Sequence, residues 1–221
     1  MTFCRGSLYA RCRWLLRKKQ SKGHGVHSPF AFDLITNVIY SPYSFYAFSD
    51  IPEILSKNGL DPYLIGRINH FSFRLVYYLK PKDILEVNTG IGVNSLFLTA
   101  PSPYIHCTCV EEDRNKVEVT GRLQEEAGRK CKMVPSLADC RGEHYDAIFI
   151  YLKDRDIPDI SVLSEMSKPA TFWVFYPINR GSAKQFWNEI VHDVNARMTF
   201  DLKDTGVVFL RKDFGKANYF V

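Results

Sequence analysis

The sequence predicts an α/β fold with a mostly parallel sheet, helices on both faces and an antiparallel ending. From about residue 60 to residue 196, short apolar runs alternate with segments of helical periodicity. Such alternation is typical of parallel strands joined by right-handed helical crossovers. After residue 196 the pattern changes to alternating runs around the turn Asp204-Thr205-Gly206, which indicates adjacent antiparallel strands.

The region before the sheet predicts a helical extension. Residues 1–58 contain short helical pieces interrupted by KGHGVHSPF and YSPYSFYAF. Asp61-Pro62 then supplies an N-cap followed by proline at the first helical position. The helix that follows should end at Lys80-Pro81, and its apolar residues recur at the helical period: Leu64, Ile68, Phe71, Leu75 and Tyr78. We therefore expect two parts, an N-terminal extension over 1–58 and the sheet domain over 59–221.

The expected strands and helices alternate along the second part. Strands are expected at 82–87, 104–110, 131–135, 145–151 and 170–176, and helices at 113–127, 156–167 and 182–196. The segments RMTFDLK, VVFLRK and ANYFV should close the sheet as neighbouring antiparallel strands.

Composition and charge limit the classes of protein to which this chain can belong. With 221 residues, 46% of them hydrophobic, the chain can bury a complete core. No apolar run approaches the roughly 20 residues of a membrane span, so we expect a cytoplasmic protein. Residues 1–32 carry seven basic side chains and no acidic one, which leaves −2 of the net charge of +5 for residues 33–221. This basic arm is suited to RNA, anionic lipid or an acidic partner, or it is the solvated face of a helix.

The six cysteines include no CxxC pair. Cys107 and Cys109 are two positions apart in an expected strand, so their side chains share one face. We expect the cysteines to be buried as small apolar residues rather than to bind metal or form disulfides.

A glycine turn after the first strand is the main candidate for a cofactor site. Glu86 ends the strand, and Asn88, Gly90 and Gly92 follow at alternate positions. Glycine and asparagine are the residues that best tolerate left-handed backbone, so the turn can be tight. A dinucleotide loop would require Ser95 as its third small residue. A loop for S-adenosylmethionine (SAM), with an acid at the strand end and small residues at alternate positions, fits better; a turn without a ligand is the remaining alternative.

An acidic residue after the second strand supports a nucleoside-containing cofactor. Glu111 lies 19 positions after Gly92, where a carboxylate can accept both hydroxyl groups of a ribose. Glu112 and Asp113 are alternatives that could instead cap the next helix. The antiparallel ending favours SAM over a dinucleotide, because a dinucleotide-binding sheet normally continues with parallel strands.

These stretches resemble class I SAM-dependent methyltransferases, in particular an uncharacterised bacterial group related to small-molecule O-methyltransferases. The resemblance is carried by GHGVHSPFAFDLI (23–35), LEVNTGIGVNSLFL (85–98), YDAIFI (145–150) and FDLKDTGVVFLRKD (200–213). It implies a Rossmann-like, seven-stranded sheet with a C-terminal antiparallel hairpin. It also implies SAM as cofactor, with contacts at Glu86, Asn88, Gly90, Gly92, Glu111 and, at the adenine side, Ser136.

The sequence departs from the family at the catalytic rim. Where relatives carry acids after the fourth and fifth strands, this chain has Tyr151 and Tyr176. Rim carboxylates hold a divalent cation in metal-dependent relatives, and tyrosines are poor ligands for a hard cation. We therefore expect no metal site, although Asp154 and Asp156 lie just beyond the fourth strand.

Catalysis without a metal would need another base. His24 and His27 lie in the family-specific GHGVHSPF segment and could act as the base if this segment folds over the cleft. The alternative is that His27-Ser28-Pro29 caps a helix that begins near Phe30. Tyr151 and Tyr176 could face a planar substrate, or they fill the space left by the missing acids.

The sequence thus favours SAM-dependent methyl transfer to a small molecule without a metal ion. The alternative is a catalytically degenerate binding or interaction module with the same fold. RNA methylation through the basic arm is less favoured, because no Asn-Pro-Pro-Tyr-type motif follows the fourth strand. The resemblance also suggests a homodimer formed through the N-terminal helices.

Overall fold

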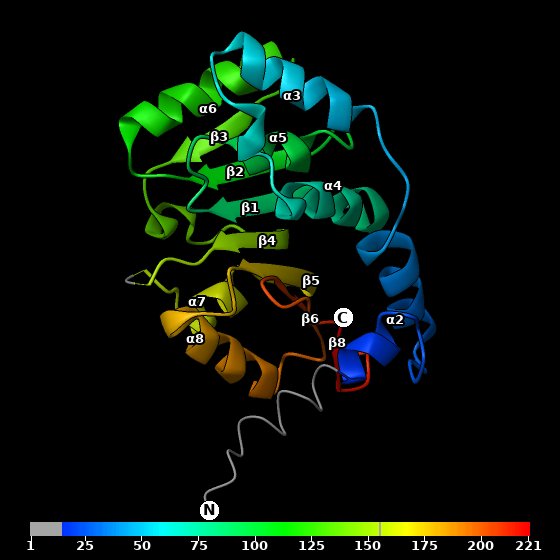
Figure 1. Ribbon diagram of the computed structural model, residues 1–221. Helices are drawn as coiled ribbons and strands as arrows, with labels where there is room; N and C mark the ends of the chain where they lie inside the picture. Colours follow the sequence, from blue (N-terminus) through cyan, green and yellow to red (C-terminus); the bar gives the residue numbers. More distant parts are fainter. Residues whose placement is uncertain (1–14, 155) are drawn as a thin grey trace, which may run out of the picture.

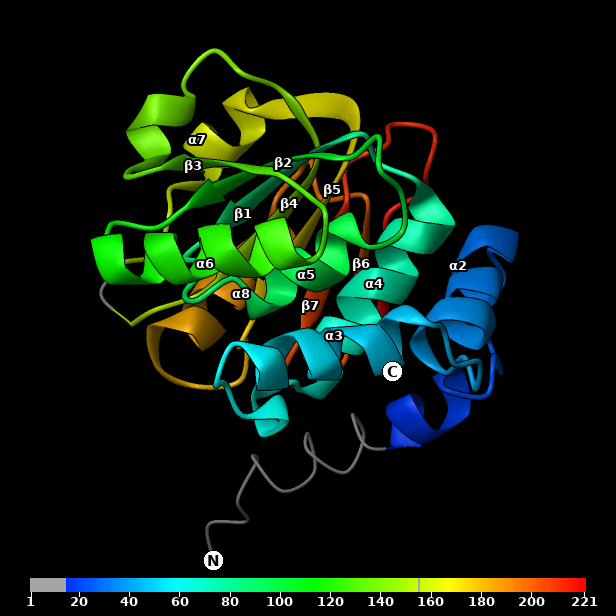
Figure 2. The same ribbon diagram turned by 90° about the horizontal axis from the view of Figure 1, so that it is seen from above.

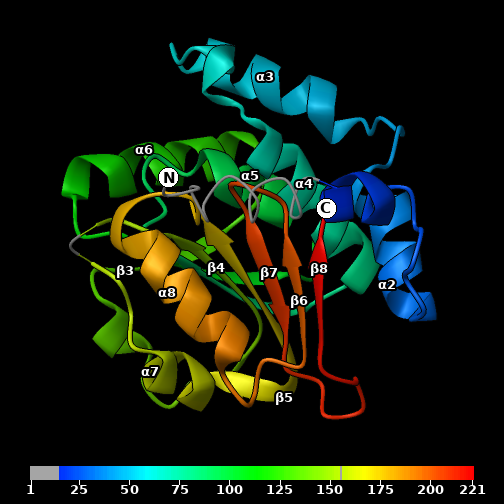
Figure 3. The ribbon, with the colours of Figure 1, turned by 60° about the horizontal axis from the view of Figure 1, so that its bottom comes forward.

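A computed structural model describes residues 15–154 and 156–221, which form a mixed sheet covered by helices on both faces (Figures 1 and 3). Its eight strands have the order β3-β2-β1-β4-β5-β7-β6-β8. In chain order they are β1 (Asp83–Val87), β2 (His106–Val110), β3 (Cys131–Val134), β4 (Tyr145–Tyr151), β5 (Ser167–Tyr176), β6 (Met198–Asp201), β7 (Gly206–Phe209) and β8 (Ala217–Phe220).

The first five strands are parallel, as the sequence predicts. Strand β7 pairs antiparallel with both β5 and β6, which forms the expected C-terminal hairpin. The last segment differs from the expectation, because β8 pairs in parallel with β6 and adds an eighth strand at the edge. Strand β7 ends with Phe209 opposite Met198, so residues 210–216 need only pass the starting end of β6 to place β8 alongside β6 in the same direction.

Residue alternation along the strands creates two core layers. One face, containing Ile84 and Phe172, packs against α4 (Arg67–Leu79) and against α2 (Pro29–Leu34). The other face, containing Leu85 and Trp173, packs against α7 (Ile160–Glu165) and α8 (Gly181–His192). Helices α4, α5 (Val93–Thr99) and α6 (Arg114–Glu126) lie side by side on the first face (Figure 2). The two layers arise because successive side chains along each buried strand point to opposite faces of the sheet.

The segment before α4 packs on the sheet domain. Helix α2 continues into a π-helical stretch, η1 (Ile35–Ile39), and lies beside β8 at the sheet edge (Figures 1 and 3). Helix α3 (Ala47–Lys57) lies outside α5 and α6 and buries Ile51 and Leu55 completely. A helical turn over residues 15–20 is fixed by Arg17, which donates hydrogen bonds to Asp201 and to the carbonyl oxygen of Val221.

The Asp61-Pro62 signal begins a shorter element than expected. Asp61 caps a 3₁₀ turn, η2 (Pro62–Leu64), through the backbone N–H of Tyr63. Helix α4 runs from Arg67 to Leu79 and is capped by Lys80, so it ends at Lys80-Pro81 as expected; Lys80 itself adopts the left-handed conformation. A 3₁₀ turn, η3 (Leu137–Cys140), lies between β3 and β4.

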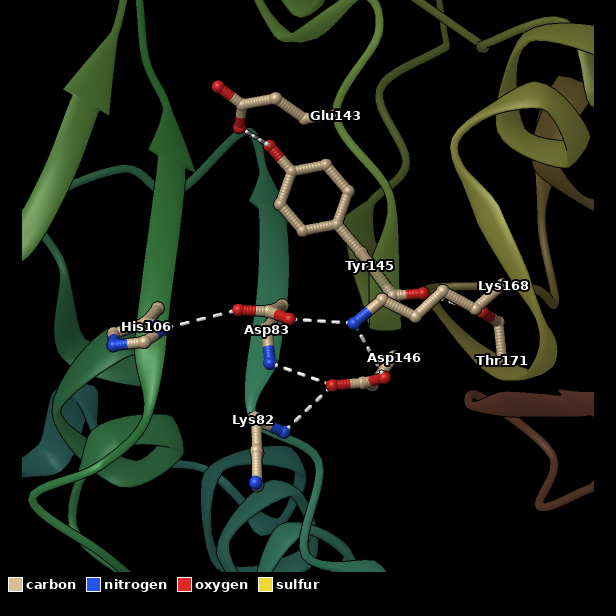
Figure 4. A network of polar contacts seen from close by, with 8 residues as sticks. All are labelled: Lys82, Asp83, His106, Glu143, Tyr145, Asp146, Lys168 and Thr171. Carbon is tan, nitrogen blue, oxygen red and sulfur yellow. Dashed lines mark hydrogen bonds and ion pairs between the residues drawn. The ribbon is translucent and has the colours of Figure 1, made fainter.

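A network of charges joins the edge where the parallel strands begin (Figure 4). Asp146 of β4 accepts hydrogen bonds from the backbone N–H groups of Lys82 and Asp83, at 2.9 Å each. Lys168 of β5 bridges the carboxylates of Asp83 and Asp146 at 2.6 and 2.9 Å. The network holds β1, β4 and β5 together at the end of the sheet opposite the glycine turn.

Among residues 15–154 and 156–221, no helix combines the length and the hydropathy needed to cross a bilayer.

Candidate functional site

A cavity of about 290 Å³ lies at the carboxyl ends of β1, β4 and β5, beside the glycine turn. This is the end of an open α/β sheet at which ligands bind. The starts of α4 and α5 close its sides. Its polar lining comes from eight side chains: Asn69, Ser72, Glu86, Asn88, Thr89, Asn94, Tyr151 and Tyr176.

Glu86 is the buried acid of this cavity. Its side chain is about 4% exposed and accepts hydrogen bonds from Asn94 Nδ2 at 2.9 Å and from the Ser95 hydroxyl. Burial, and then the neighbouring Cys109 thiol, raise the pKa of the Glu86 carboxyl to about 8. The group is therefore largely protonated at neutral pH, and a nearby positive charge would favour its ionised form.

Asn69 and Asn94 extend the hydrogen bonding from Glu86 to α4. Asn69 Nδ2 donates to Asn94 Oδ1 at 3.1 Å, and Asn69 Oδ1 accepts from the backbone N–H of Gly66 at 2.7 Å. The Ser72 hydroxyl also borders the cavity and is buried without a hydrogen-bond partner in the described structure. The sequence pattern alone does not predict any of these three residues as part of the site. The available signal was that Asn69 and Ser72 interrupt the apolar positions of α4, and that Asn94 lies in the first turn after Gly92.

The glycine turn has the left-handed conformations that its residue types predict. Asn88, Gly90 and Gly92 have φ values of 61°, 65° and 81°. Asn88 Nδ2 donates a hydrogen bond to the carbonyl oxygen of Tyr151 at 2.9 Å, which connects the turn to the end of β4. Asn88 therefore supports the tight turn despite its side chain.

Gly90 and Gly92 serve different purposes in this turn. A Cβ atom on Gly92 would lie 2.6 Å from Thr120 of α6, so Gly92 allows the turn to pack against that helix. A Cβ atom on Gly90 would meet no atom within 4 Å. The space above Gly90 is thus open for a ligand to approach the backbone closely.

Glu111 is held against the same turn. Its side chain is buried, and its carboxylate accepts hydrogen bonds from the backbone N–H of Gly90 at 2.9 Å and of Asp113 at 3.2 Å. Asp113 caps α6 by accepting from the backbone N–H of Asn115. The structure thus separates the helix cap, Asp113, from the carboxylate that contacts the loop, Glu111. Gly90, Gly92 and Glu111 adjoin the cavity but do not line it.

Tyr151 and Tyr176 lie next to each other at the cavity mouth. Their ring centroids are 5.7 Å apart and the ring planes cross at 61°. Burial and the nearby Asp204 raise the pKa of Tyr176, so its phenol remains protonated and can donate a hydrogen bond. The two rings lie at the carboxyl ends of β4 and β5.

The structure does not bring His24 and His27 to the cavity. Both side chains are exposed, and His27 borders a separate pocket with Tyr78, which lies near the end of α4. Ser28 caps α2, and Phe30 packs against Phe214 with ring centroids 4.7 Å apart, which anchors this segment away from the glycine turn. The expectation that GHGVHSPF folds over the cleft is therefore wrong.

Three other candidates from the sequence also lie outside the cavity. Ser136 is exposed and caps η3 by accepting from the backbone N–H of Ala138. Asp154 accepts a hydrogen bond from the Ser182 hydroxyl at the start of α8, and Asp156 is exposed. The basic residues Arg5, Arg11 and Arg13 lie outside the described residues, whereas Arg17 is paired with Asp201.

Comparison with solved structures identifies several methyltransferases of similar fold. An O-methyltransferase from Bacillus cereus, solved in complex with SAH, has a TM-score of 0.61 at 15% identity, over 80% of this chain and 96% of that chain. A putative O-methyltransferase from Klebsiella pneumoniae has a TM-score of 0.60 at 15% identity, over 80% and 94%. The O-methyltransferase TomG from Streptomyces achromogenes, in complex with SAM, has a TM-score of 0.57 at 16% identity, over 80% and 95%.

No protein-family model matches the sequence, and no curated protein does either. The structural likeness nevertheless extends over most of this chain and nearly all of each similar protein. It agrees with the mostly parallel sheet and its antiparallel C-terminal hairpin. The chain therefore has the Rossmann-like fold of the class I methyltransferases.

Proposed function

We propose that this protein is a SAM-dependent methyltransferase that acts on a small molecule without a metal ion. The observation that carries the proposal is the buried Glu86 carboxyl, which faces a cavity beside the open left-handed turn at Gly90. Solved structures of the same fold are described as complexes with SAM or SAH, which supports this choice of cofactor.

Three features of the described residues fit a cofactor of this kind. The space at Gly90 leaves the backbone open to close approach. The Ser72 hydroxyl faces the cavity side of α4 with an unused hydrogen-bonding capacity. Glu86 supplies a buried carboxyl that a positively charged ligand would ionise. We assign cofactor contacts to Glu86, Asn88 and Gly90, with Glu111 as the ribose acid and Gly92 as the residue that seats the turn on α6.

When bound, SAM supplies a methyl group on a positively charged sulfonium. The chain's own contribution is to position the groups that surround it, because in-line displacement depends on alignment. The chain of hydrogen bonds from Asn69 through Asn94 fixes the Glu86 carboxyl. Tyr151 and Tyr176 offer two ring surfaces for a planar acceptor, and Tyr176 can donate a hydrogen bond to its oxygen.

The donor set at the rim supports metal independence. Among the described residues that line the cavity, Glu86 is the sole carboxylate and no histidine is present. A hard divalent cation requires several oxygen ligands, usually including more than one carboxylate. We therefore expect no heat of binding when Mg²⁺ is titrated into the protein.

Calorimetric titration with SAM, and separately with SAH, tests the proposal. We expect dissociation constants in the micromolar range for the parent protein and loss of binding in Gly90→Arg, because the new side chain fills the open space above the turn. Gly142→Arg is a matched control. Gly142 also has a positive φ, at 84°, and no atom within 4 Å of an added Cβ, but it lies outside the cavity.

Absence of heat with both ligands, together with no thermal protection at millimolar concentration, would overturn the proposal. The glycine turn would then be a structural feature only, and the protein would be a binding or interaction module. Equal loss of binding in Gly90→Arg and Gly142→Arg would show that the effect arises from unfolding. The circular dichroism spectra of both variants are therefore compared with that of the parent protein.

A further inference from the structure

Three cysteines come together on two neighbouring strands. Cys107 and Cys109 alternate along β2 and point to the same face of the sheet, as the sequence predicts. Cys131 begins β3 and is the direct register partner of Cys107. The three thiols therefore form a triangle on the face that α4 and α5 cover.

The sulfur atoms are spaced as ligands of one ion. The Sγ atoms of Cys107 and Cys109 are 3.7 Å apart, and all three Sγ atoms lie within 4.8 Å of one another. A point equidistant from three such sulfurs is about 2.1–2.8 Å from each, which brackets the Zn–S distance of about 2.3 Å. No large movement of either strand is needed to bring the three sulfurs into coordination.

The site is accessible from one side and has a compensating charge. Cys107 and Cys131 line a cavity of about 1060 Å³, together with the side chain of Arg129. Arg129 is half-buried and donates a hydrogen bond to the carbonyl oxygen of Leu96 at 2.9 Å. Three thiolates around a divalent cation have a net charge of −1, which the guanidinium can offset.

We propose that Cys107, Cys109 and Cys131 form a three-thiolate site for a thiophilic closed-shell cation, Zn²⁺ or Cu⁺. Thiolates select these ions over Mg²⁺ or Ca²⁺. Each thiol that ligates the ion loses its proton to water, and no electron is transferred. The site is separate from the cofactor cavity, although the Cys109 thiol donates to Glu86 Oε2 at 3.7 Å.

A variant with only these three cysteines allows a direct test. Cys4→Ser, Cys12→Ser and Cys140→Ala remove the other cysteines of the chain. The untagged, reduced protein is titrated without oxygen, with Zn²⁺ in one arm and Cu⁺ in the other. We expect one equivalent to bind in at least one arm and Cys131, the partly buried thiol, to become resistant to alkylation. Thiolate-to-metal charge-transfer absorption, measured with Cu⁺ and with Cd²⁺ as a probe for Zn²⁺, should accompany binding.

Removing one ligand should weaken binding by at least the roughly 10–100-fold that loss of an outer-shell partner costs. Cys131→Ser is the preferred change because Cys131 is only partly buried; Cys107→Ala is a second variant if the first does not fold. The parent with all six cysteines should bind the same single equivalent at this site, and Cys140→Ala alone should leave the affinity unchanged.

Failure of both cations to bind the reduced three-cysteine protein would overturn the proposal. Binding that persists unchanged in folded Cys131→Ser and Cys107→Ala would overturn it too, because the ion would then lie elsewhere. A disulfide between two of the three thiols in the protein as purified, with no cation binding after reduction, would identify a redox pair instead.

Discussion

Glu86 is the residue whose chemistry is most altered by its place in the fold. The sheet topology puts its carboxyl beneath α5, where only Asn94, Ser95 and Cys109 contact it as polar partners among the described residues. Burial is the largest cause of its raised pKa, and the hydrogen bonds from Ser95 and Asn94 oppose that effect. The carboxyl consequently titrates near neutral pH, where a ligand can change its protonation state.

Binding of SAM should release a proton from Glu86. The pKa of Glu86 in the free protein is about 8. If the complex contains the ionised carboxylate, about 0.9 proton per site is released at pH 7. Affinity should therefore rise about tenfold per pH unit below 8 and level off above it. Titration calorimetry in buffers of different ionisation enthalpy measures the proton count directly.

Glu86→Gln provides the control for this prediction. The amide preserves the shape of the side chain but does not titrate, so proton release and the slope of affinity against pH should both disappear. An unchanged pH profile in Glu86→Gln would show that another group, in the protein or in the ligand, is responsible.

The two glycines of the turn should respond differently to alanine. Both have positive φ, which costs an L-residue roughly 1–2 kcal/mol. Gly92→Ala adds a collision with Thr120 and should lower the free energy of unfolding by about 1–3 kcal/mol more than Gly90→Ala. Urea denaturation of the two variants measures the difference. Equal losses would mean that α6 moves away at little cost.

At the scale of residues, local backbone chemistry was predictable and side-chain environment was not. The conformations of Asn88, Gly90 and Gly92 follow from their residue types. The placement of His24 and His27 does not, because it depends on where Phe30 finds its apolar partners. The roles of Asn69 and Asn94 could not be predicted from the sequence either. Their hydrogen bonds toward Glu86 form only when α4 and α5 pack against β1.

Three strands are joined at their starting ends by Asp83, Asp146 and Lys168 (Figure 4). Hydrogen bonding to Lys168 is the largest cause that lowers the pKa of Asp83. Burial opposes the shift at Asp146, but hydrogen bonds from Asp83, Lys168 and Lys82 outweigh it and lower that pKa as well. Because both folded-state values lie below the unfolded ones, the network stabilises the protein above about pH 4 and loses its effect as pH falls further.

Lys168→Met should therefore weaken the sheet only when the aspartates are charged. The side chains are about one-third exposed, which limits the expected loss to about 1 kcal/mol at pH 7. The difference from the parent should shrink as pH is lowered below about 4, and urea denaturation at several pH values measures it. Lys132→Met removes an exposed pair with Glu143 and should have no measurable effect. A loss that persists at low pH would point to packing of the lysine stem instead.

At the scale of elements, position and type were predictable while boundaries and edges were not. All five parallel strands and the three later helices lie where hydrophobic periodicity puts them. Asp61-Pro62 was assigned to α4 but caps η2, because a cap signal does not specify how long the following helix is. The pairing of β8 with β6 could not be read from alternation, which is the same in parallel and antiparallel edge strands.

Much of the N-terminal extension shares the hydrophobic core of the sheet domain. Leu34 and Ile35 are completely buried in the same core cluster as Leu75 and Phe172. Helix α3 similarly shares a core cluster with α5 through Ile51 and Leu55. A segment whose apolar residues lie in a shared core has no core of its own. The boundary near residue 58 is thus a change in sequence pattern, and we expect it not to separate two independently folding domains.

A single cooperative unfolding transition is the corresponding prediction. Trp14→Phe leaves fluorescence from Trp173 and Trp187, which lie on the opposite face of the sheet from α2. Urea unfolding followed by this fluorescence and by far-ultraviolet circular dichroism should give one midpoint. Leu34→Ala should lower both midpoints together, at a cost of about 3 kcal/mol, because the cavity it leaves lies in the shared core.

Two separate transitions would contradict this prediction. If the extension were independent, Leu34→Ala would shift an early loss of helical signal while the fluorescence transition stayed at its parental midpoint. The matched change Leu163→Ala, also completely buried but in the cluster beneath α7, distinguishes the cases. In one cooperative unit both substitutions move both probes, because loss of packing on either face of the sheet unfolds the strands that the two layers share.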